Sequence, residues 1–80
     1  LMSKTIDFNT LVHMNQLLKA KGIEYSLHSF GGCTFSGMEL RQDGKVSNIE
    51  DIVEILNDFL KDKWMRVEVD PVNSTILNVK

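Results

Sequence analysis

The segment LLKAKGIEYSL at residues 17–27 aligns without a gap with FLKDKWMRVEV at residues 59–69. Apolar residues coincide along the two segments, and the same offset of 42 residues pairs Phe35 with Leu77 further along the chain. Self-similarity at one constant spacing is typical of a duplicated supersecondary unit. One helix with one hairpin has too little apolar surface to fold by itself, whereas two copies can bury their apolar faces against each other. The sequence therefore predicts two copies of one helix-and-hairpin unit.

The first unit begins with an amphipathic helix that is predicted from about residue 8 to residue 21. The apolar residues of this helix recur with a 3.6-residue period along one face: Leu11, Met14, Leu17 and Leu18. The side chain of Asp7 or of Asn9 can cap the first turn, and Gly22 is the expected left-handed residue after the last turn. His13 falls on the opposite, outer face of the helix.

The second unit begins with a helix that is predicted from about residue 48 to residue 62. Residues 47–50, SNIE, match a capping box, in which the Ser47 side chain accepts a hydrogen bond from the amide of Glu50 and the Glu50 carboxylate reaches back. The apolar stripe of this helix consists of Ile49, Ile52, Val53, Leu56, Phe59 and Leu60. Because the repeat aligns Leu18 with Leu60, we expect both to point inward on the same side of one sheet.

A hairpin is predicted after each helix, over residues 23–42 and 64–79. Apolar and polar residues alternate in both segments, which is typical of strands with one buried face. Gly31 and Gly32 are expected at the tip of the first hairpin, because tight turns need positive φ angles. The apolar parity of the return strand shifts across Gly37, so we expect a bulge or bend there.

These elements form one α+β domain over residues 1–80, with the order αββαββ. The predicted architecture is a pseudo-duplicated unit, in which a four-stranded antiparallel sheet carries two helices packed on one face. A chain of 80 residues buries only roughly 60 to 68% of the surface that it exposes when unfolded, so self-association would add stability.

Composition and charge exclude several classes of function. Hydrophobic residues make up 42% and charged residues 25% of the chain, which is typical of a folded, water-soluble domain. The formal net charge is −2 and the Lys and Arg residues are scattered, so neither direct nucleic-acid binding nor membrane binding is expected. One cysteine cannot form an internal disulfide, and no apolar run is long enough for a membrane span, so a cytoplasmic location is expected.

The sequence contains few residues that could carry catalysis. Its thiol and imidazole groups are Cys33, His13 and His28, which are too few for a metal site. The glycine pair joins two strands and no Walker lysine follows, so no phosphate loop is expected. We therefore predict no enzyme activity, no cofactor and no small-molecule ligand. One enzymatic alternative stays open, a thiol enzyme that uses Cys33 with His28, since positions 28 and 33 can be cross-strand neighbours.

The leading hypothesis is a small non-enzymatic interaction or regulatory module, which binds a protein partner or a second copy of itself. Packing of both helices on one face leaves the other sheet face open. The contact surface is predicted there at His28, Phe30, Trp64, Arg66 and Ile76. An edge strand offers a second route to association, including homodimerisation.

An alternative hypothesis rests on the polar side of the second helix. Carboxylates recur there at spacings of three and four residues and form an acidic ridge: Asp51, Glu54, Asp58 and Asp62. Such an array can imitate nucleic-acid phosphates or dock on a basic partner. On this hypothesis the protein inhibits a nucleic-acid-handling enzyme, as a bacterial, phage or mobile-element accessory protein would.

Overall fold

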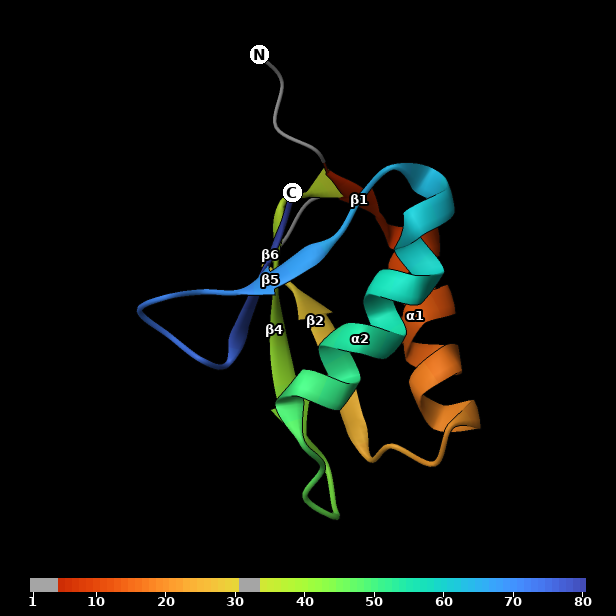
Figure 1. Ribbon diagram of the computed structural model, residues 1–80, viewed down its shortest axis with the longest axis vertical. Coiled ribbons are helices and arrows are strands. Elements are labelled where there is room, and N and C mark those ends of the chain that lie inside the picture. Colours follow the sequence, from red (N-terminus) through yellow and green to blue (C-terminus); the bar gives the residue numbers. More distant parts are fainter. Residues whose placement is uncertain (1–4, 31–33) are drawn as a thin grey trace.

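Two helices cover one face of an antiparallel sheet (Figure 1). The computed structural model describes residues 5–30 and 34–80. The helices are α1 (Phe8–Ala20) and α2 (Ile49–Leu60), and α2 continues into the 3-10 helix η1 (Lys61–Lys63). The main sheet contains β2 (Tyr25–Ser29), β4 (Gly37–Gln42), β5 (Val67–Val69) and β6 (Ile76–Val79). These described elements confirm the predicted α+β class, with two helices and a four-stranded antiparallel sheet.

The strand order of the main sheet is β2-β4-β6-β5, so the second strand of each hairpin lies at the centre. The two central strands pair antiparallel, with Met38 opposite Leu77, and so join the two hairpins. The two edges of the sheet are β2 and β5. A short additional pair, β1 (Ile6–Asp7) with β3 (Thr34–Phe35), was absent from the prediction, because strands of two residues are too short to show an alternating pattern.

The two helical segments end in the same way, 42 residues apart in the chain. Gly22 and Trp64 both have left-handed backbones, with φ angles of 75° and 59°. The amide of the following residue donates a hydrogen bond to the carbonyl of Leu18 in the first unit (2.9 Å) and to that of Leu60 in the second (3.3 Å). Leu18 and Leu60 are both fully buried. The sequence repeat therefore corresponds to a repeat in the helix caps.

The core lies between the helices and the sheet. Its buried residues come from both units: Ile6, Leu11, Met14, Leu18, Leu27, Phe35, Met38, Leu40, Ile52, Leu56, Leu60, Val67, Leu77 and Val79. No polar or charged residue is buried in the part of the chain that the structure describes. Within the core, apolar burial, at about 25 cal/mol per Å² of apolar surface, thus holds the helices on the sheet.

The sequence predicted the N-cap residue of α1 among its two candidates, but not that of α2. Asp7 caps α1 by accepting a hydrogen bond from the amide of Thr10 (2.9 Å), and hydrogen bonding from Thr10 holds the pKa of Asp7 below its usual value. The capping box predicted at Ser47 is wrong, because Asn48 caps α2 and accepts from the amide two residues later (2.9 Å). The backbone N–H and C=O of Ser47 instead bond to the hydroxyl of Tyr25, both at 3.3 Å.

The first hairpin bends one residue earlier than predicted. Ser36, and not Gly37, interrupts the strand between β3 and β4. Gly37 belongs to β4, where an added Cβ would lie 3.4 Å from the side-chain oxygen of Asn78. That distance is an ordinary van der Waals contact, and Gly37 lies within the strand rather than at the bend. The predicted tip at Gly31 and Gly32 lies outside the described residues.

An asparagine from each helix closes one edge of the sheet. The side chain of Asn15 accepts a hydrogen bond from the N–H of Leu27 (2.7 Å) and donates one to its C=O (3.0 Å). The side chain of Asn57 makes the same two bonds to Val67, at 2.7 and 3.2 Å. Leu27 and Val67 lie in the edge strands, so these outward backbone groups would otherwise be available to a further strand. Each edge is thus blocked at one residue by a side chain.

Replacing Asn15 by alanine should leave two partly buried backbone groups of Leu27 without partners and lower the free energy of unfolding by about 1–3 kcal/mol. Asn57→Ala should act in the same way through Val67. Urea unfolding followed by circular dichroism measures the change. The matched control is Gln16→Ala, which removes an exposed amide from the same helix. An Asn15→Ala protein as stable as the control would contradict the edge-closing role.

The two left-handed cap residues should respond differently to substitution. Gly22→Ala should lower the free energy of unfolding by about 1 kcal/mol, because a Cβ at this φ of 75° is strained although nothing lies within 4 Å of it. Trp64→Gly should leave the free energy of unfolding unchanged or raise it, because glycine adopts a φ of 59° without that strain. Urea denaturation curves of both variants test this expectation. A large loss of stability in Trp64→Gly would show that the indole itself holds the fold.

Candidate functional site

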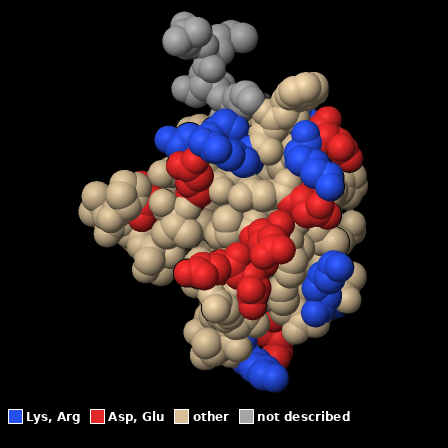
Figure 2. All heavy atoms as spheres, in the orientation of Figure 1, with Lys and Arg blue, Asp and Glu red and all other residues tan. Residues whose placement is uncertain are grey.

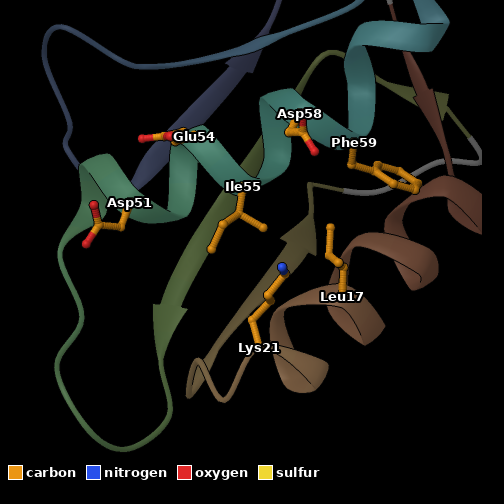
Figure 3. Close-up of a pocket in the computed structure, with 7 residues that line it drawn as sticks. All are labelled: Leu17, Lys21, Asp51, Glu54, Ile55, Asp58 and Phe59. Carbon is orange, nitrogen blue, oxygen red and sulfur yellow. The ribbon is translucent and has the colours of Figure 1, made fainter.

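A groove of about 520 Å³ lies between α1 and α2. Its lining residues come from both helices: Leu17, Lys21, Asp51, Glu54, Ile55, Asp58 and Phe59. In Figure 3, Leu17 and Ile55 project toward each other, whereas the carboxylates of Asp51 and Glu54 point outward. Leu17, Ile55 and Phe59 are partly buried. The groove therefore has an apolar floor and, along α2, an acidic wall.

Three of the four predicted ridge residues form this acidic wall: Asp51, Glu54 and Asp58. The fourth, Asp62, lies in η1 beyond the end of α2 and does not line the groove. Figure 2 shows acidic side chains gathered in the middle of the face on which α2 lies, with Lys and Arg side chains around them. The acidic ridge is thus one side of a concave surface rather than an isolated row.

Asp58 differs from a solvated carboxylate because a cation is bonded to it. Its Oδ1 lies 2.8 Å from the Nζ of Lys61. This hydrogen bond and the charge of Lys61 hold the pKa of Asp58 below its usual value, and Lys21 adds to the effect. The same contact raises the pKa of Lys61. Both side chains are exposed, so the pair keeps Asp58 ionised at lower pH but contributes little to stability.

Sequence reasoning missed the floor of the groove and the α1 side of it. Leu17 was expected in the core but is only partly buried, and Lys21 was not singled out. Ile55 could have been found from the sequence, because it is an apolar residue that follows Glu54 and lies outside the predicted apolar stripe. The sequence pattern does not predict how α1 and α2 are placed relative to each other, so it could not predict a groove between them.

The open face of the sheet carries some of the predicted contact residues close together. The strand register places His28, Glu39 and Ile76 in one row across β2, β4 and β6. Phe30 directly follows β2, is 61% exposed, and has a ring atom 3.9 Å from where a Cβ of Gly37 would lie. Phe30 and Gly37 are therefore neighbours on this face.

Trp64 and Arg66 lie toward the other edge of the sheet from His28, because β5 and β2 are the two edges. Adjacent strands are about 4.8 Å apart, so these edges are separated by roughly 14 Å. Trp64 follows η1 and is 84% exposed. It lines a hollow of about 300 Å³ together with Lys61, Met65, Arg66 and Lys80. The predicted contact residues thus fall into one group around Phe30 and another around Trp64.

Polar side chains on the open face pair with one another. Arg66 contacts Glu68 at 2.7 Å. Asn78 donates a hydrogen bond to Asp70 (2.8 Å), and this bond, with backbone amides of the following turn, holds the pKa of Asp70 below its usual value. A partner that bound this face would have to compete with these internal pairs.

The thiol alternative stays a prediction, because Cys33 lies outside the described residues. The Nε2 of His28 lies 2.7 Å from the hydroxyl oxygen of Ser26. In residues 5–30 and 34–80, no group of three or more His, Cys, Asp or Glu side chains is arranged to hold a metal ion. Within the same ranges, no helix combines the length and the apolar character that crossing a bilayer needs. His13 is exposed on α1.

No family model matches this chain, and neither the curated proteins nor the solved structures contain a significant match to it. The groove, the open sheet face and the hollow beside Trp64 are the surfaces whose geometry bears on function.

Proposed function

We propose that this protein is a non-enzymatic binding module, which takes up a basic, amphipathic segment of a partner protein in the groove between α1 and α2. The observation that supports it is the combination of an acidic wall with an apolar floor. Asp51, Glu54 and Asp58 recur every three or four residues along about 10 Å of α2. Ile55 and Phe59 lie beside them and are only partly buried.

The lining of the groove defines the chemistry of the partner. A repeated negative array attracts cations spaced by one helical turn, and a partly exposed apolar floor favours an aliphatic or aromatic side chain between those cations. Lys21 on the α1 side repels cations, so the segment would lie along α2. Basic segments of this kind are typical of the surfaces by which nucleic-acid-handling enzymes hold their substrates, which supports the inhibitor hypothesis.

A fluorescent peptide with Lys or Arg at every third or fourth position and Leu between them should bind this protein. Glu54→Lys should weaken the binding about tenfold, because it places a repelling charge in the wall. Raising the salt concentration should also weaken it, because exposed charges are screened beyond about 10 Å at 0.1 M ionic strength. Fluorescence anisotropy measures the dissociation constant in each case.

Asp62→Lys is the matched control for the peptide experiment, because it makes the same charge change on an acid that does not line the groove. It should bind the peptide nearly as well as the unaltered protein does. Equal loss of affinity in the two variants, or binding that is indifferent to salt, would reject the groove as the binding site.

A second candidate function is homodimerisation through the open sheet face. The apolar side chains of Phe30 and Ile76 lie there among paired polar groups, which supports a contact surface. Closure of both sheet edges by Asn15 and Asn57 favours this face over an edge strand as the route of association.

Sedimentation equilibrium tests this second candidate. Phe30→Ser should weaken a face-to-face dimer, because it removes an exposed aromatic ring from that face. Val72→Ser should leave the dimer intact, since Val72 is 93% exposed but lies in the turn between β5 and β6. The same association constant for both variants would exclude the open face as the dimer contact.

A further inference from the structure

We infer that one occupant of the groove is a second copy of this chain, which inserts its own segment from Lys61 to Arg66 between α1 and α2. The inference rests on the proposed function of the groove and adds the identity of an occupant. The segment reads KDKWMR. Its cations flank the exposed Trp64 and also Met65, which is partly buried and packs against the core of its own copy. The segment thus offers one exposed apolar side chain among cations, which suits the acidic wall and the apolar floor.

The segment is presented on the surface of each copy. Lys61, Lys63 and Arg66 are exposed, and Trp64 is 84% exposed. Lys61 and Arg66 are paired with Asp58 and Glu68 of their own copy, so another copy would compete with these exposed pairs. A large aromatic side chain among cations is typical of the anchor residues of protein interfaces. Asp62 is the one acid within the segment, and it leaves the segment with a net positive charge.

Trp64 has a left-handed backbone, a conformation that glycine adopts more easily than any other residue. The equivalent cap in the first unit is made by Gly22, with a φ of 75° and the same hydrogen bond to the preceding turn. A tryptophan at a φ of 59° is strained, whereas glycine would make the same cap without strain. A large aromatic side chain at such a position, 84% exposed, fits a binding anchor.

Contacts within one copy already display the chemistry that the inference requires. Lys61 is bonded to Asp58 of the acidic wall (2.8 Å), and the Nζ of Lys63 lies 5.9 Å from the centre of the Phe59 ring in the groove floor. These contacts lie at the end of α2, where the segment begins. Asp51 and Glu54 lie one to two turns further back, so the segment of another copy would pair with them.

We take the contact to be head-to-tail, in which each copy inserts its segment into the groove of the next, because the groove and the segment are different surfaces of the molecule. Each copy offers one groove and one segment, so the association would continue from copy to copy as a chain or close into a ring. A face-to-face dimer through the open sheet would instead stop at two copies.

A mixing experiment with two variants tests the head-to-tail contact. Asp51→Lys combined with Glu54→Lys reverses the acidic wall, and Trp64→Gly removes the anchor while keeping a relaxed left-handed cap. At low ionic strength the unaltered protein should grow beyond a dimer as its concentration rises in sedimentation equilibrium. Each variant alone should associate at least roughly tenfold more weakly, the effect expected for loss of an interface anchor. Urea unfolding checks that both variants are folded.

An equimolar mixture of the two variants should form a dimer that does not grow. The wall variant still offers its segment, and the Trp64→Gly variant still offers its groove. A mixture that associates no better than its components, or an unaltered protein that stays monomeric, would overturn the inference. Loss of association in Phe30→Ser alone would overturn it in favour of the open face. If the protein does not self-associate but the basic peptide binds in the groove, the inference is rejected and the proposed function stands. If the peptide does not bind either, both are rejected.

Discussion

The pairing of β4 with β6 is the contact on which the rest of the structure depends. It joins the return strands of two hairpins at the centre of one sheet, so that the apolar faces of both units turn toward one core. Leu18 and Leu60 are both fully buried in that core, to which both halves of the chain contribute. The same pairing brings α1 and α2 side by side and makes β2 and β5 the edges (Figure 1).

The helices then have two structural tasks. Their apolar stripes cover one face of the sheet, and an asparagine from each binds the outward backbone groups of an edge strand. Closed edges discourage strand-to-strand association, and the open face carries charges that are already paired with one another. The groove between the helices differs from the open face in its charge balance. Its acidic wall has three carboxylates, and the described ion pairs connect one of them, Asp58, to a cation. This imbalance beside partly exposed apolar groups is why the groove is the surface we favour for binding.

Gly22 and Trp64 occupy the same kind of helix cap, although only one of them is a residue that favours it. Both residues end a helical segment with a left-handed backbone, and both are followed by the same return hydrogen bond. Only glycine makes this cap without strain, so the tryptophan breaks a local rule that the other half of the chain obeys. Departures of this kind are expected at functional positions, where selection acts on binding rather than on local stability.

Local patterns in the sequence determined the fold class, the helices and the left-handed cap at Gly22, because periods of 3.6 and 2 residues record which side of each element is buried. They could not choose between neighbouring caps: Asn48 rather than Ser47 caps α2, and the Ser47 backbone is held by Tyr25 from another part of the chain. The spacing of the acidic ridge was also visible in the sequence. Only the tertiary structure decided the strand order, the closure of the edges by asparagines and the groove that joins Leu17 and Lys21 to that ridge. These features depend on contacts between residues far apart in the chain, which no local period encodes.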